Sequence, residues 1–113
     1  MTAAQDRIAI GGLRRRLSLE APVETPDGLG GVTRGFVTVA AFWASVDWLG
    51  GAEQWRQGRP QQTGSHRIVL RWRAGVDAGM RLRDGARIFE IKATGDPDGS
   101  RRRLVCLADE VTP

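Results

Sequence analysis

The chain has 113 residues, of which 15 are glycine, and carries a formal net charge of +4. Hydrophobic residues make up 41% of it, a composition that fits one small globular domain and excludes a disordered chain. The longest mostly apolar run, residues 36–49, contains Asp47 and is shorter than the roughly 20 residues of a membrane helix, so we expect no membrane span. The first ten residues lack a signal-peptide pattern, which predicts use in the cytoplasm or in a particle assembled there.

Short extended runs separated by glycine-rich turns predict a mostly β fold, either a small barrel or a sandwich. In residues 13–19 three leucines alternate with polar side chains, which predicts a first strand. Residues 20–35 contain two prolines and four glycines and predict a loop or a wide hairpin. Residues 36–48 form the longest extended candidate, with apolar groups on both faces and an expected bend near Ala40-Ala41.

The second half of the chain carries clearer strand patterns. In residues 66–73 apolar and arginine side chains alternate, which predicts a strand with one face in water. Residues 80–83 and 87–94 flank an Asp-Gly pair, a strong signal for a hairpin. After a turn at 95–100, residues 101–108 predict the last strand.

We expect a single domain over residues 1–113. It would comprise an N-terminal extension (1–11), a barrel core (12–108) and a C-terminal tail (109–113). The core would contain a long polar loop at about residues 50–65, and loops of this length without secondary structure are usually functional or mobile. Trp55 is the best candidate for an interface anchor there, since a large apolar ring in a polar loop is better placed against a partner. The candidate partner or ring interface is Gln54, Trp55, Arg56, Arg59, Gln61 and Gln62.

The sequence contains few of the residues that commonly act in catalysis. The chain has one histidine, one cysteine and no tyrosine, and its cysteine and histidine have no metal-ligand spacing. Cys106 lies in an apolar run and is expected to be a buried core residue, while His66 is expected to have a structural role. We therefore expect no enzymatic activity, no cofactor and no metal.

Arginine supplies nearly all of the positive charge and has two interpretations. It can face DNA phosphates or an acidic neighbouring subunit, or it can form solvated strand faces that also protect edge strands. We expect the first and last strands to pair and so gather this charge. Trp43 and Trp72 fall within strands and are expected in the core. The candidate contacts to DNA or to an acidic partner are Arg14, Arg16, Arg71, Arg73, Arg101 and Arg103.

Six segments together carry a resemblance to a known family. In chain order they are GLRRRLSL (12–19), TPDGLGGVT (25–33), VAAFWASV (39–46), TGSHRI (63–68), GVDAGM (75–80) and RIFEI (87–91). With these motifs in this order and spacing, the chain resembles the phage head–tail joining family, also called head-closure or stopper proteins. Its arginine- and alanine-rich composition is similar to the version carried by bacterial gene transfer agents.

The resemblance implies a small β-barrel with a long loop, acting as a structural connector in a virion or gene transfer agent particle. The expected partners are further copies in a six- or twelve-fold ring, the portal or adaptor complex, and a tail terminator or tail tube protein. Such a ring would retain packaged DNA in its channel and dock the tail. The alternative interpretation, from basic charge and aromatic strands, is a stand-alone small β-barrel that binds nucleic acid.

Overall fold

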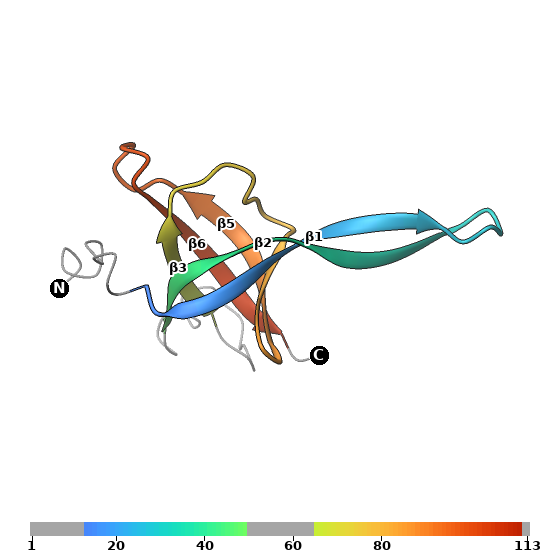
Figure 1. Ribbon diagram of the computed structural model, residues 1–113, viewed down its shortest axis with the longest axis horizontal. Helices are drawn as coiled ribbons and strands as arrows, with labels where there is room; N and C mark the ends of the chain where they lie inside the picture. Colours follow the sequence, from blue (N-terminus) through green and yellow to red (C-terminus); the bar gives the residue numbers. More distant parts are fainter. Residues whose placement is uncertain (1–12, 50–64, 112–113) are drawn as a thin grey trace, which may run out of the picture.

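The computed structural model describes residues 13–49 and 65–111, which form an all-β domain without helices. The strands are β1 (Arg15–Pro26), β2 (Val32–Trp48), β3 (Ser65–Arg71), β4 (Arg81–Asp84), β5 (Arg87–Gly95) and β6 (Arg103–Val111). They pair antiparallel in the order β1-β2-β3-β6-β5-β4, and β4 pairs back onto β1 to close a barrel (Figure 1). The predicted β fold is confirmed, and closure makes it a barrel rather than a sandwich. In these two ranges no helix is long and apolar enough to cross a membrane.

Strand boundaries differ most from the prediction at two places. Residues 20–35, expected to be a loop or wide hairpin, are mostly β structure, since β1 runs to Pro26 and β2 starts at Val32. The last strand continues through Val111, past the end expected for the core, because residues 109–111 pair with β3 and β5. The Asp-Gly hairpin is confirmed between β4 and β5, where Gly85 has a φ of 62°.

The hairpin of β1 and β2 is longer than the barrel. Its register runs from Arg15 opposite Ala44 to Pro26 opposite Val32, but β4 pairs with β1 only at residues 18–20. The pairing of β2 with β3 likewise begins at Ala44. Residues 21–38, which we call the arm, therefore project from the barrel as a two-stranded ribbon (Figure 1). Prolines are tolerated in this part of β1 because it has no second neighbouring strand.

A β-bulge lies where the arm leaves the barrel. Leu19 is opposite Ala40 and Glu20 is opposite Thr38, so Val39 is the extra residue. A bulge bends its strand and increases the local twist. It lies next to Ala40-Ala41, where a bend was expected from the sequence.

An ionic cluster fixes the base of the arm. The residue Glu20 is only 8% exposed, and its carboxylate accepts hydrogen bonds from Arg81 Nε at 2.5 Å and Arg83 Nε at 3.0 Å. The Arg81 guanidinium also lies 3.8 Å from the ring centroid of Phe36, on the opposite strand of the arm. Arg81 on β4 thus joins both strands of the arm to the barrel wall.

The core fills the barrel from all six strands. Its buried members are Leu17, Leu19, Ala44, Ile68, Leu70, Val76, Leu82, Phe89, Ile91, Leu104, Cys106 and Ala108. The prediction that Cys106 is a core residue is confirmed, and burial raises the pKa of its thiol to about 12. His66 is also buried, with its ring edge-on to Phe89 at 5.0 Å and its Nε2 3.8 Å from Glu110 Oε1.

We predict that Glu20→Gln destabilises the fold. Burial alone would raise the pKa of Glu20, but hydrogen bonds from Arg81 and Arg83 outweigh it and hold the pKa below its ordinary value. A carboxylate with a depressed pKa contributes stability that is complete above its unfolded-state pKa and is lost as the pH falls through the folded-state pKa. At neutral pH the substitution should lower the free energy of unfolding by about 1–3 kcal/mol, as measured by urea denaturation.

The matched control for this prediction is Glu24→Gln, four residues further along the same strand. Glu24 is exposed and lies 3.9 Å from Arg34, so its loss should change stability by less than about 0.5 kcal/mol. Acidification below about pH 4 should reduce the difference in the free energy of unfolding between Glu20→Gln and the unmodified chain. Equal stability of the two variants at neutral pH would contradict the role assigned to Glu20.

Candidate partner-binding site

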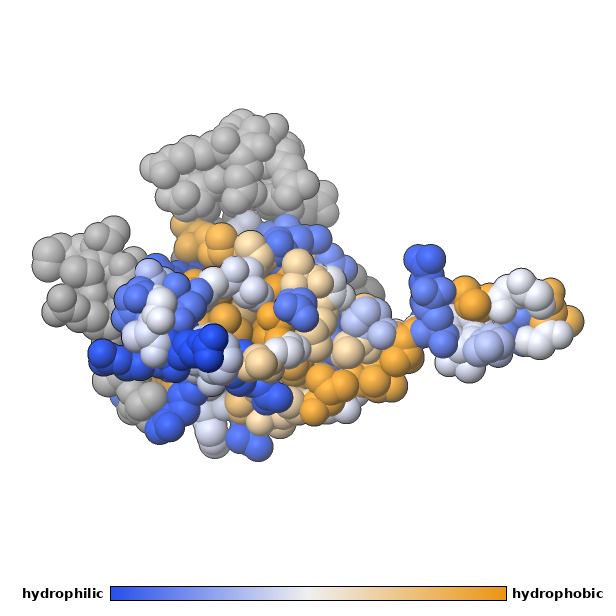
Figure 2. All heavy atoms as spheres, turned by 90° about the horizontal axis from the view of Figure 1, so that it is seen from above, coloured by the Kyte–Doolittle hydropathy of each residue, from blue (hydrophilic) through white to orange (hydrophobic). Residues whose placement is uncertain are grey.

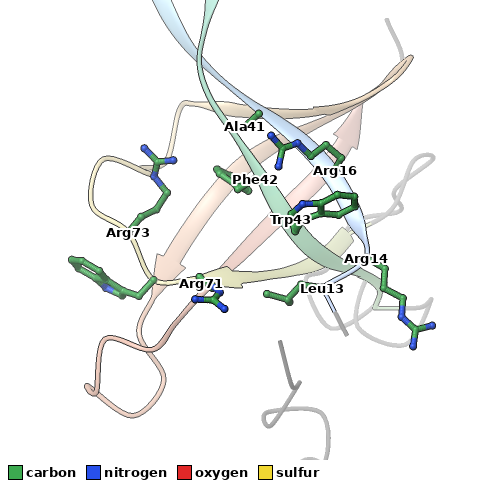
Figure 3. Close-up of a pocket in the computed structure, with 9 residues that line it drawn as sticks. Leu13, Arg14, Arg16, Ala41, Phe42, Trp43, Arg71 and Arg73 are labelled. Atoms are coloured by element: carbon green, nitrogen blue, oxygen red, sulfur yellow. The ribbon is translucent and has the colours of Figure 1, made fainter. Parts of the chain in front are cut away.

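A hollow of about 780 Å³ lies on the barrel wall where the start of β1, the middle of β2 and the residues after β3 meet. Its lining consists of arginines around a largely apolar floor (Figure 3). The lining residues are Leu13, Arg14, Arg16, Ala41, Phe42, Trp43, Arg71, Trp72 and Arg73.

Strand alternation places Arg16 and Trp43 outside the barrel, whereas Phe42, on the same side of β2 as Ala44, packs partly against the core. Leu17 and Ala44 point into the core, so their neighbours Arg16 and Trp43 point outward, directly opposite each other in the β1–β2 register. The Arg16 guanidinium lies 5.5 Å from the ring centroid of Trp43. Trp43 is 53% exposed, so the prediction that it belongs to the core is wrong. Apolar groups on both faces of β2 concealed which face was buried.

Two further arginine–aromatic contacts extend this surface. Arg73 lies 5.6 Å from the ring centroid of Phe42, and Arg101 lies 5.2 Å from that of Trp72. Trp72 packs partly against the core, in agreement with its expected position. Stacked guanidinium groups keep their charge while covering apolar rings. The surface can therefore receive a partner that is apolar at its centre and negatively charged at its edge.

The six arginines selected from the sequence end up close together, although by a different route from the one expected. Four of them line the hollow, and Arg101 covers Trp72 at its rim. Arg103 on β6 is the register partner of Arg71 on β3. The first and last strands do not pair, so that expectation is wrong, and β2 and β3 bring the charges together instead. Arg101 precedes β6, in a turn held by its N–H donating to Asp96 Oδ2 at 2.7 Å.

Other arginines are committed to ion pairs. Arg15 forms an ion pair with Asp84, and Arg87 forms one with Glu110. Arg81 and Arg83 both form ion pairs with Glu20. Within the described ranges no ion pair involves three of the four hollow arginines, Arg16, Arg71 and Arg73. Their charge is available to carboxylates or phosphates of a partner.

The arm is a second exposed surface. The sequence predicted a loop or a wide hairpin over residues 20–35 but named no binding surface there. Its two strands and its tip carry apolar side chains in contact with water (Figure 2). These are Val23, Leu29, Val32, Phe36 and Val37, with Val39 at the bulge. The alternation of β-branched residues on both sides of the Pro-Asp-Gly turn was the signal that could have identified it.

The tip of the arm has a defined conformation. Asp27 Oδ1 accepts hydrogen bonds from the N–H of Leu29 at 2.7 Å and of Gly31 at 3.1 Å. Gly28 and Gly30 have φ values of 80° and 87°, a region that side chains rarely adopt. This turn holds Leu29 at the apex, where it is 90% exposed.

The polar-loop candidates Gln54, Trp55, Arg56, Arg59, Gln61 and Gln62 lie outside the described residues. In the part of the chain that the structure does describe, no group of three histidine, cysteine, aspartate or glutamate side chains is arranged to hold a metal ion.

Comparison with known proteins now identifies the family. The family model described as phage head completion protein matches residues 8–111, nearly the whole chain. This chain belongs to that family. Head completion proteins are structural components of the virion and not enzymes, in agreement with the sparse catalytic inventory. No curated protein sequence matches the chain.

Two solved structures resemble this head completion protein over most of their length. One is a chain of the virion of a native gene transfer agent particle, with 30% identity and a TM-score of 0.67, covering 89% of this chain and 97% of that chain. The other is the solution structure of protein SF1141 from Shigella flexneri 2a, with 28% identity and a TM-score of 0.70, covering 89% and 95%. The family resemblance inferred from the six motifs is thus confirmed.

We predict that the two hollow tryptophans differ in their effect on folding. Trp43→Ala should lower the free energy of unfolding by about 1 kcal/mol or less, since it removes only cross-strand contacts on an exposed face. Trp72→Ala should lower the free energy of unfolding by about 2–4 kcal/mol, because the ring packs against the core. Urea denaturation followed by far-ultraviolet circular dichroism measures both. An equal loss in the two variants would contradict the assignment of Trp43 to a partner-facing surface.

Proposed function

We propose that this head completion protein is a head-closure subunit. Copies form a ring between the portal or adaptor complex and the tail, and the ring retains packaged DNA and provides the surface on which the tail docks. The observation that carries this proposal is the arm, a projecting ribbon whose apolar side chains the described residues leave exposed.

The energetics of the arm support an assembled state. A two-stranded ribbon alone is marginally stable in water, because its side chains have little to pack against. Large exposed apolar areas on small proteins usually mark contact surfaces. The arm and the hollow are also different surfaces at separate places on the chain. Contacts between unlike surfaces continue from copy to copy and close into a ring when the rotation allows it.

The arginines support a location next to polyanions. Packaged DNA and acidic protein surfaces both present oxygen anions, which guanidinium groups bind in a bidentate manner. The similarity to a chain of a gene transfer agent virion supports placing this protein in a phage-like particle, either a phage or a gene transfer agent. In this proposal the polar loop containing Trp55 and its neighbours Gln54 and Arg56 provides further ring or partner contacts.

A second candidate function is that of a stand-alone nucleic-acid-binding barrel. The arginine–aromatic hollow favours it, because stacked rings and cationic side chains also bind single-stranded nucleic acid. The two functions differ in what the isolated chain does. A stand-alone binder would bind DNA at micromolar or tighter affinity at physiological salt, with affinity that falls steeply as salt rises.

The test replaces one hollow arginine in the producing cell. We predict that Arg73→Gln yields particles that lack tails or whose DNA is accessible to added nuclease, because the arginine-lined surface no longer holds its partner. The measurement is the fraction of tailed, nuclease-protected particles, by electron microscopy and DNA quantification.

Lys92→Gln is the charge-matched control. Lys92 is exposed on β5, outside the hollow, and forms an ion pair with Glu90, so particles carrying Lys92→Gln should be normal. Tailed and DNA-filled particles from Arg73→Gln in normal number would count against the proposal. Salt-sensitive DNA binding by the isolated chain would then favour the second candidate.

A further inference from the structure

We propose that the tip of the arm, residues 26–31, inserts into the arginine-lined hollow of the neighbouring copy. This inference rests on the ring of the proposed function and specifies its subunit contact. The partner for both surfaces is a second copy of this chain.

The geometry of the hairpin prevents the tip from reaching the hollow of its own chain. The hollow lies at the barrel end of β1 and β2, near the register pair Arg15 and Ala44, while the tip follows the pair Pro26 and Val32. The eleven steps from Arg15 to Pro26 span about 36 Å at roughly 3.3 Å per residue. The tip is joined to the hollow by a continuously paired ribbon, so it cannot fold back onto its own hollow.

The chemistry of the two surfaces is complementary. Leu29 at the apex offers an exposed apolar side chain, and the floor of the hollow offers Leu13, Phe42 and Trp43. Asp27 uses Oδ1 for its two backbone hydrogen bonds, and within the described residues no hydrogen bond reaches its Oδ2. That oxygen carries charge that the arginines of a neighbouring hollow can bind.

A second hollow on the barrel fits the tip less well. It has a volume of about 420 Å³ and is lined by residues of β3, β5 and β6 with Leu49. It contains one arginine, Arg67, and an aspartate, Asp96, whereas the larger hollow contains four arginines and no acidic side chain. The tip carries the negatively charged side chain of Asp27 and is therefore electrostatically matched to the larger hollow.

The tip is already ordered for binding. The hydrogen bonds of Asp27 and the left-handed glycines fix the turn before any contact forms, so little further backbone entropy is lost on insertion. Each copy presents one tip and one hollow at opposite ends of a single hairpin. Such a head-to-tail contact propagates around a ring, whereas a self-complementary contact would stop at a dimer.

Disulfide trapping in assembled particles tests this contact. The chain carrying both Leu29→Cys and Ala41→Cys places one thiol at the tip and one on the exposed floor of the hollow. After mild oxidation a non-reducing gel should show a ladder of covalent oligomers that ends at the full ring. The native Cys106 is fully buried and should not contribute.

The matched control carries Leu29→Cys with Ala86→Cys, an exposed position in the β4–β5 turn outside the hollow. It should give no ladder. Leu29→Ser provides a second variant that cannot disturb the fold, since the side chain is almost wholly exposed. It should increase dissociation of purified rings about tenfold or more, measured by native mass spectrometry.

The outcomes separate this contact from the ring itself. Rings of normal size that form no ladder, that give the same ladder with the control pair, or in which Leu29→Cys links only to a portal or tail protein would overturn the inference and leave the proposed function standing. Particles that contain this protein without any ring would overturn the proposed function instead.

Discussion

The β1–β2 hairpin is hydrogen bonded along its full length, but only its inner half has further strands beside it. This difference between the two halves of the hairpin determines how the rest of the molecule is arranged. The inner half closes the barrel by pairing with β3 and β4. The outer half extends into solvent, where its apolar side chains are exposed. Because a two-stranded ribbon has no interior, the stability of the arm depends on the barrel at its base and on a partner at its tip.

The charges of the chain follow the same division. At the base of the arm, Arg81 and Arg83 surround the buried Glu20, and this cluster determines where the ribbon leaves the barrel. Around the hollow, Arg16 and Arg73 stack on aromatic rings and have no ion pair within the described ranges. One set of arginines therefore stabilises the monomer, and the other remains available for binding, so both interpretations of the arginine clusters apply to different members.

Local patterns in the sequence predicted much of the barrel, and its long-range features were harder to predict. Alternation identified β3, and the Asp-Gly pair identified the β4–β5 hairpin, because both signals act over a few residues. Residues 20–35 were predicted as a loop or a wide hairpin because prolines and glycines interrupt them. The choice between the two could not be made, since edge position, which tolerates proline, is a property of the sheet and not of the segment. The exposure of Trp43 was missed because β2 is apolar on both faces. The hollow combines three segments distant in sequence, and only the barrel order brings them together.

Amide hydrogen exchange of the arm tests most directly whether contacts made on assembly complete this fold. Backbone amides of residues 21–38 should exchange rapidly in the isolated chain and become strongly protected in assembled particles, while core amides such as those of β3 are protected in both states. If the arm were equally protected in the isolated chain, or remained unprotected in the particle, the claim that assembly completes this fold would be contradicted.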